Sequence, residues 1–404
     1  MTYNATVSFL RRMTSSDYRA AVAAEAAGNV ELAAEKYALA GELDGAVRMH
    51  LARAARAGNR LSEIGALRDA IRWAGDVPDL KKRASAALGR ALWEAARAEG
   101  IATERDRNKV REAAELLVAG DEHATAGEAL ESIGDHLAAA NAYSAGGLVE
   151  RMEAALAKDD DAQHRAREEA EAFANYETHM RVGRRDDART DLQKCIEVAG
   201  GAGSAGGQYR RMLDQLDTSL LTAGKLELRR RGKAALVACA AGKIVLGRDA
   251  LCDLTLRAGG VSRQHAEIEH TGGRYQLRDL DSRNGTSIGG LPLAGRVPLT
   301  GTGKFGLGDE CVVDFELTAD GALILRVHGG LDRGLALIAG DDGARLDLAP
   351  LGTPLDVVFQ RGRPLLGRGA AKDLQFNGEP LGAVRVQIMR GDRLVVDGDE
   401  IDIG

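Results

Sequence analysis

The spacing of apolar residues changes near residue 200, and this change most constrains what the chain can fold into. From about residue 15 to 200, apolar residues recur every three or four positions in a segment rich in Ala, Glu, Arg and Leu, which is the period of an α-helix. Beyond residue 224, runs such as KIVLG and ALILRV have the alternation and composition of β-strands and are separated by Gly and Asp turns. The sequence therefore predicts a multidomain α plus β protein, with helices first and β-sandwiches after them.

Gly turns divide the helical segment into short hairpins that partly repeat. The sequence GNVELAAEKYALAG at 28–41 aligns with GDHLAAANAYSAGG at 134–147, and GRRDDARTDLQ at 183–193 keeps one Gly and one Ala of the pattern. A Gly ends one helix, and small residues allow the next helix to pack closely. The pattern resembles tetratricopeptide-like helical hairpins, which implies a repeat or solenoid over residues 1–199 that holds a protein partner. An ordinary helical bundle is the alternative.

Residues 200–224 are expected to connect the two halves. The sequence GGAGSAGG at 200–207 has the composition of a flexible linker, and one more helix is expected from Gln208 to about Ala223.

Composition and missing motifs exclude several classes of function. The formal charge of −6 argues against a nucleic-acid partner recruited by overall charge. No apolar run approaches the length of a membrane span, and the N-terminal segment lacks the pattern of a signal peptide, so we expect no membrane insertion and a cytoplasmic location.

The 4 cysteines lie far apart and the chain has only 8 histidines, so we expect neither a metal nor another cofactor. Catalytic motifs are missing, and GTGK at 301–304 lacks the flanking residues of a P-loop, so no catalytic residue and no enzyme activity is expected.

Four short motifs follow one another in the β half: LGRD at 246–249, VSRQHAEI at 261–268, DLDSRNGTSIGG at 279–290 and LGDECVVDF at 307–315. This ordered set of Gly-Arg, Ser-x-x-His and Asn-Gly-Thr resembles the forkhead-associated (FHA) family. The resemblance covers residues 225–320. It implies a β-sandwich that binds phosphothreonine peptides with the loops at one end.

The chemistry of these residues suits a phosphate group, which presents close to two negative charges and three acceptor oxygens. Arg248 offers a planar fork of donors, and Ser262 offers a hydroxyl beside the backbone N–H groups of Ser262 and Arg263. Each such charge-assisted hydrogen bond contributes roughly 1.5–3 kcal/mol. Arg263 and Arg283 are expected to border the site, and the resemblance assigns Asn284 to the peptide backbone.

A second group of residues is expected to support the site: Gly247, His265, Gly285 and Thr286. The resemblance implies that His265 packs inside and joins neighbouring loops by hydrogen bonds. Each site residue also has an ordinary alternative, because Arg248 by itself could be a surface arginine, Ser262 a turn residue and Asn284-Gly285 a hairpin turn.

The last part of the chain, residues 321–404, contains a weaker second copy of the same pattern. GKIVLGRDALCDLTL at 242–256 aligns with GRPLLGRGAAKDLQF at 362–376, so that Arg368 takes the place of Arg248. In the same alignment Gly382 and Arg385 take the places of Ser262 and His265. We therefore expect a degenerate FHA-like domain that packs, self-associates or binds protein without phosphate.

Two functions remain open. The first is a phosphothreonine-binding adaptor in bacterial Ser/Thr kinase signalling, which holds a second protein on its helical region. The alternative is a phosphorylation-independent scaffold of a bacterial secretion or ATPase-linked assembly.

Overall fold

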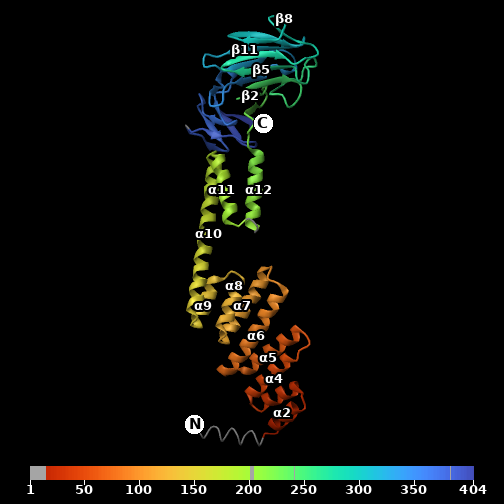
Figure 1. Ribbon diagram of the computed structural model, residues 1–404, viewed down its shortest axis with the longest axis vertical. Helices are drawn as coiled ribbons and strands as arrows, with labels where there is room; N and C mark the ends of the chain where they lie inside the picture. The colour runs from red at the N-terminus through yellow and green to blue at the C-terminus, as the bar shows by residue number, and fades with distance from the viewer. Residues whose placement is uncertain (1–14, 201–203, 241, 383) are drawn as a thin grey trace. The chain divides into compact units, whose positions relative to one another are not determined.

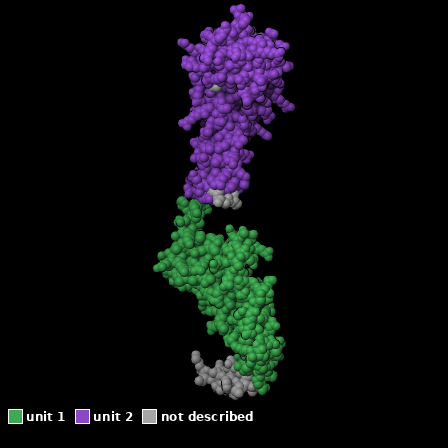
Figure 2. All heavy atoms as spheres, turned by 45° about the vertical axis from the view of Figure 1, so that its right-hand side comes forward, with its two compact units in different colours: residues 1–166 green, residues 167–404 purple. Residues whose placement is uncertain are grey.

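The computed structural model of the chain describes residues 15–200, 204–240, 242–382 and 384–404 (Figure 1). The chain divides into two compact units, residues 1–166 and residues 167–404 (Figure 2). The predicted class is confirmed, because helices come first and β-sandwiches follow. The predicted boundary at residue 199 does not coincide with the division between the units, since the last helices belong to the same unit as the strands.

The helices of the described part follow the predicted order, and Figure 1 shows those of the first unit as successive short hairpins. Their bounds are α2 (Ser16–Ala26), α3 (Val30–Leu39), α4 (Leu43–Ala55), α5 (Arg60–Ala74), α6 (Pro78–Glu99), α7 (Glu104–Ala119), α8 (His123–Ser132), α9 (His136–Ala145), α10 (Val149–Arg181), α11 (Arg185–Val198) and α12 (Ser204–Ser219). Neighbouring helices pack mainly through alanines, which are the most numerous buried hydrophobic residues of this half. Small side chains allow close helix approach, so the composition itself explains the tight hairpins.

The repeat seen in the sequence is also present in the packing. Tyr37 lies buried and donates to Glu25, and Tyr143 lies buried and donates to Glu131 at 3.4 Å. An arginine covers each ring, Arg48 at 5.7 Å from the first ring centroid and Arg151 at 5.8 Å from the second. The hairpins α2–α3 and α8–α9 therefore each bury a tyrosine at the corresponding position, with the same kinds of contact.

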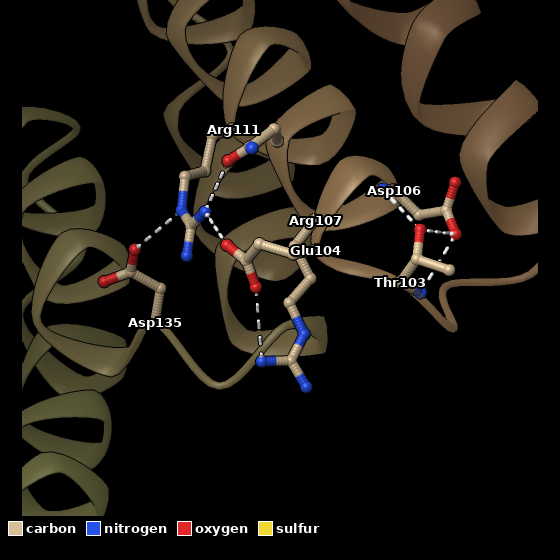
Figure 3. A network of polar contacts seen from close by, with 7 residues as sticks. Thr103, Glu104, Asp106, Arg107, Arg111 and Asp135 are labelled. Atoms are coloured by element: carbon tan, nitrogen blue, oxygen red, sulfur yellow. Dashed lines mark hydrogen bonds and ion pairs between the residues drawn. The ribbon is translucent and has the colours of Figure 1, made fainter.

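Polar contacts fix the entry into α7 and its junction with α9 (Figure 3). Thr103 and Asp106 form a reciprocal cap at the start of α7. One turn further, Arg111 donates to Glu104 at 2.8 Å and lies 3.6 Å from the carboxylate of Asp135, which caps α9. The cap of one helix is thus held by a side chain of another.

The end of α10, α11 and α12 pack against the C-terminal strands within the second unit. The carboxylate of Asp392 receives a hydrogen bond of 2.7 Å from Arg185, and both side chains are 1% exposed. The backbone N–H of Gln387 donates to Gly183, and that of Arg390 donates to Ser219, each at 2.8 Å. The predicted Gly-rich linker lies partly outside the described residues, at 201–203, and its last residues form the start of α12.

The strands of the second unit form three sheets. Their bounds are β1 (Lys225–Arg230), β2 (Leu236–Cys239), β3 (Lys243–Gly247), β4 (Leu254–Thr255), β5 (Ala266–Thr271), β6 (Arg274–Asp279), β7 (Thr286–Ile288), β8 (Leu291–Pro292), β9 (Arg296–Leu299), β10 (Thr302–Leu307), β11 (Cys311–Leu317), β12 (Leu323–Val327), β13 (Ala336–Ala339), β14 (Arg345–Asp347), β15 (Asp356–Gln360), β16 (Arg363–Gly367), β17 (Leu374–Phe376), β18 (Glu379–Pro380), β19 (Val386–Gln387), β20 (Arg393–Val396) and β21 (Asp399–Ile403). The long sheet has the order β18-β17-β20-β21-β1-β2-β13-β12-β11-β10-β7-β8. The two shorter sheets have the orders β4-β3-β5-β6-β9 and β14-β15-β16-β19.

Three strands of the long sheet belong to two hydrophobic cores at once. In β2, Leu236 and Ala238 face the C-terminal core, whereas Val237 and Cys239 face the core shared with the β3–β5 sheet. Strands β12 and β13 divide their side chains between the same two cores. Because successive side chains point to opposite faces of a strand, the centre of this sheet is buried on both sides. Strands β12 and β13 thus belong to both sandwiches, although they lie after residue 320, where the first sandwich was predicted to end.

Both ends of the long sheet are protected by proline. The edge strand β8 contains Pro292 and the edge strand β18 contains Pro380, and each is only two residues long. Proline lacks the N–H that a further strand would need, so neither edge favours the addition of another chain.

None of the helices in the described ranges has both the length and the apolar composition that crossing a bilayer requires.

The close approach of helices predicts unequal effects for two glycine substitutions. A Cβ atom added at Gly127 would lie 2.3 Å from the ring of Tyr143, whereas at Gly65, also inside a helix, it would meet nothing within 4 Å. We expect Gly127→Ala to destabilise the helical unit by roughly 1–3 kcal/mol through overpacking, and Gly65→Ala to stabilise it by about 0.5–1 kcal/mol. Urea unfolding followed by tryptophan fluorescence measures both, since Trp93 lies in the same core as Tyr143. Equal effects of the two substitutions would contradict the packing described.

Candidate functional site

Three loops at one end of the first sandwich form an open pocket of about 1020 Å³. The first loop follows β3, the second precedes β5, and the third connects β6 to β7. The residues that line the pocket are Arg248, Asp249, Gly259, Gly260, Val261, Ser262, Arg263, Gln264, Leu280, Asp281, Arg283 and Asn284. All five residues predicted to contact a ligand are among them.

The glycine before Arg248 is required for a steric reason. A Cβ atom at Gly247 would lie 2.2 Å from the carbonyl oxygen of Arg263, so only glycine fits. The close approach allows the N–H of Arg248 to donate to Ser262 and the N–H of Asp249 to donate to Arg263, both at 2.9 Å. The side chain of Arg248 is exposed and has no hydrogen-bond or ion-pair partner among the described residues. Its guanidinium group is therefore free to bind an anion.

The groups of Ser262 are divided between the fold and the pocket. Its hydroxyl oxygen accepts from the N–H of Arg283 at 3.0 Å, which leaves the hydroxyl proton able to donate. Its own N–H donates to His265 at 3.0 Å and is therefore not available to a ligand, which corrects the expectation that this N–H would join the site. The N–H of Arg263 has no acceptor in the described part of the chain and remains able to donate.

His265 joins two loops from inside the sandwich. Its ring is fully buried, Nδ1 accepts from Ser262, and Nε2 lies 3.0 Å from the carbonyl oxygen of Gly285. Because Nδ1 accepts, the proton of a neutral ring lies on Nε2, which then donates to Gly285. Burial lowers the pKa of His265, although the contact with Gly285 and the charge of Asp279 act in the opposite direction. A neutral imidazole thus holds the serine loop against the asparagine loop.

Asp279 braces the third loop and was not among the predicted site residues. Its carboxylate accepts from the N–H and the hydroxyl of Ser282, at 2.8 and 2.7 Å, and from the hydroxyl of Thr286. Burial tends to raise the pKa of Asp279, but these hydrogen bonds outweigh it and the pKa is lowered. An Asp followed three residues later by Ser is a turn pattern, so Asp279-x-x-Ser282 was the available signal.

Asn284 also acts within the fold. Its amide donates to the carbonyl oxygen of Gly260 at 2.9 Å and so joins the third loop to the second. The side-chain oxygen of Asn284 has no partner in the described residues and remains able to accept from a ligand. Gly285 follows with a φ of 71°, a left-handed conformation that glycine adopts without strain.

The charges that line the pocket are mixed but positive in sum. Arg248, Arg263 and Arg283 contribute three cations, and Asp249 and Asp281 contribute two carboxylates. The carboxylate of Asp249 accepts from the N–H of Leu251 at 3.0 Å, so it is partly used by its own loop. The arrangement suits a compact anion with several acceptor oxygens, such as a phosphate monoester.

In the described loops of the second copy, charged side chains bind groups of the same chain. Arg368 donates to the carbonyl oxygens of Ala371, at 2.8 Å, and Lys372. Arg385 precedes β19 as His265 precedes β5, and it forms an ion pair with the buried carboxylate of Asp356. That carboxylate also accepts from the N–H of Gly369 at 2.9 Å. An internal carboxylate therefore satisfies the cation here.

Comparison with known proteins identifies the first sandwich. The family model of the FHA domain matches residues 244–308. No curated protein sequence matches the chain.

Solved FHA domains match a small part of the chain. One, from a study of phosphothreonine-dependent FHA domain interactions, is 28% identical and covers 21% of this chain and 88% of its own, with a TM-score of 0.18. The domain FHA-1 of Rv1747 from Mycobacterium tuberculosis is 26% identical and covers 23% and 94%, with a TM-score of 0.19. The FHA domain of FhaA, solved in complex with the intracellular domain of Rv3910, is 30% identical and covers 21% and 90%, with a TM-score of 0.18.

The buried imidazole predicts how this site responds to pH. We expect His265 to titrate below the ordinary value of 6.5, because burial disfavours its charged form. Since the folded pKa is the lower one, the unfolded chain binds more protons, and the contribution of the neutral ring to stability is complete above pH 6.5 and decreases as the pH falls below it. An NMR titration of the His265 ring measures this, with the same chain in urea as the reference. A midpoint at or above the urea value would contradict a neutral, buried ring.

Proposed function

Because residues 244–308 form an FHA domain, we propose that the protein is an adaptor that binds a phosphothreonine-containing protein through Arg248, Ser262 and Arg263. The observation that supports the proposal most is the free guanidinium of Arg248, which lines the same pocket as the hydroxyl of Ser262 and the unpaired N–H of Arg263. Three donors on two loops match the three oxygens of a phosphate group. The loops are already held in place by His265, Asp279 and Asn284, so little ordering is required on binding.

We further propose that the helical unit holds a second protein, so that the chain connects it to the phosphorylated one in bacterial Ser/Thr kinase signalling inside the cytoplasm. A groove of about 470 Å³ between α7, α8 and α9 supports this part of the proposal. Apolar side chains, including Val118 and Leu130, line the groove. Arg111 lies at its border and is held by Glu104 and Asp135 (Figure 3). Because Glu104 and Asp135 already neutralise Arg111, the groove suits the apolar side chains of a partner segment.

The mode of action proposed is binding and not catalysis. The four cysteines are buried and unpaired, and burial raises the pKa of Cys239 to about 12 and that of Cys311 to about 11. A thiol with so high a pKa is a poor nucleophile at neutral pH.

A phosphorylation-independent scaffold is the second candidate, and the second sandwich favours it. There the loops bind Asp356 of the same chain in place of an external anion. If the first sandwich worked in this way too, partner binding would not depend on phosphate.

Phosphopeptide binding decides between the two candidates. We expect the full chain to select phosphothreonine peptides from a degenerate library over phosphoserine and unphosphorylated ones. Arg248→Ala and Ser262→Ala should each weaken binding by about 10- to 150-fold, which corresponds to the loss of one charge-assisted hydrogen bond of roughly 1.5–3 kcal/mol. Fluorescence anisotropy with a selected peptide measures the affinities.

Arg368→Ala is the matched control, because Arg368 is the counterpart of Arg248 in the second copy and its guanidinium is bound by its own loop. It should leave the affinity unchanged. Partner binding by a well-folded chain that ignores both phosphate and Arg248→Ala would leave the scaffold as the function.

A further inference from the structure

A second groove lies on the other side of the loop that follows Arg248. It has a volume of about 530 Å³, and Ala250 of that loop, Thr255 of β4 and Arg257 after it form one wall. Strand β1 and the turn after it form the opposite wall, and residues 331–335 close the end. The groove therefore shares the segment 248–257 with the phosphate pocket, which contacts the same segment through Arg248 and Asp249.

The outer face of β1 makes this groove charged. Leu226 and Leu228 point into the C-terminal core, so the alternate residues Lys225, Glu227 and Arg229 line the groove. This strand lies beside β2 in the long sheet, at the seam where the first sandwich passes into the second.

Cations outnumber carboxylates in the groove by five to two. The carboxylate of Glu227 pairs with Arg229 at 2.8 Å, and that of Asp332 pairs with Arg257 at 2.9 Å. Both carboxylates are thus neutralised inside the groove.

The remaining cations are Lys225, Lys233 and Arg333, which have no carboxylate partner in the part of the chain that the structure describes. Lys225 donates to the carbonyl oxygen of Cys252 at 3.1 Å. The side chains of Lys233 and Arg333 have no polar contact within the described residues. A groove with three uncompensated cations favours a negatively charged occupant.

We propose that this groove is a second subsite for the phosphorylated partner and binds an acidic stretch a few residues away from the phosphothreonine. The proposal rests on the proposed function, since the phosphothreonine in the first pocket brings the stretch to the groove. An extended peptide advances about 3.3 Å per residue, so a few residues are enough to pass over Asp249 and Ala250 from one pocket into the other. Once the phosphate is bound, the acidic residues reach the groove at a high effective concentration, and weak ion pairs there become effective. The partner is therefore a phosphothreonine protein with clustered Asp or Glu on one side of the modified residue.

The test uses the full chain and three labelled phosphothreonine peptides, one with neutral flanks, one with three Glu residues before the phosphothreonine and one with three after it. We expect one of the acidic peptides to bind about 5- to 20-fold tighter than the neutral peptide at low salt, with a smaller gain at high salt. The double variant Lys233→Ala/Arg333→Ala should remove that gain and leave the affinity for the neutral peptide unchanged.

Arg274→Ala/Lys372→Ala is the matched control, because it removes the same charge at sites away from the groove. Arg274 begins β6 at the end opposite the site loops, and Lys372 lies in the second sandwich. The control should keep the full gain.

The proposal is overturned if neither acidic peptide gains affinity, or if the gain survives the groove variant or is lost equally in the control. Binding of the neutral phosphopeptide tests the proposed function separately. If the acidic peptides bind equally well without phosphate, the proposed function fails and the groove is not a subsite for a phosphorylated partner.

Discussion

The β half depends on three strands that are buried on both faces. Strands β2, β12 and β13 alternate their side chains between two cores, so neither sandwich has a complete core without the other. Burial of apolar surface contributes about 25 cal/mol per Å², and a strand that buries both faces gains on both. The pocket lined by Arg248 and Ser262 lies on a sandwich whose rear sheet is fixed by a second sandwich. This explains how three open loops can keep their conformation without a ligand.

A buried ion pair joins the C-terminal strands of the same sheet to the neighbouring helix α11. Arg185 and Asp392 form a fully buried ion pair, and the ring of Phe376 lies under the guanidinium group at 5.4 Å. Burial lowers the pKa of Arg185, against the attraction of Asp392. Such a pair adds little net stability compared with apolar side chains, but loss of one partner leaves a buried charge and costs about 3–5 kcal/mol. The pair thus specifies one arrangement of α11 on the C-terminal strands and disfavours others.

The local elements of this architecture could be predicted from the sequence, but the pairing of strands far apart in the chain could not. The helical period, the Gly turns and the ordered motifs around Arg248, Ser262 and Asn284 are local patterns, and the helices, strands and pocket follow them. The parallel pairing of β2 with β13 joins segments about a hundred residues apart. Both segments are continuous apolar runs, which indicates burial on two faces but not the partner. The use of the Ser262 N–H by His265 was also hidden, because it depends on the rotation of one ring.

The two sandwiches differ in what the residue before the second loop-bearing strand contacts. Leu246 pairs with Ala266 in the first, and Leu366 pairs with Val386 in the second, so the strands that present the two loops have the same register. At the residue before the second strand the first sandwich has His265, a neutral ring that accepts a hydrogen bond and leaves the nearby arginine unpaired. The second has Arg385, an exposed arginine whose guanidinium group forms an ion pair with the buried carboxylate of Asp356. The buried charge in the second sandwich is therefore the Asp356 carboxylate, which needs cations or hydrogen bonds, whereas the buried neutral ring of His265 needs hydrogen bonds only. In the first sandwich a buried neutral ring thus joins the loops, and in the second an ion pair within the chain takes the corresponding place.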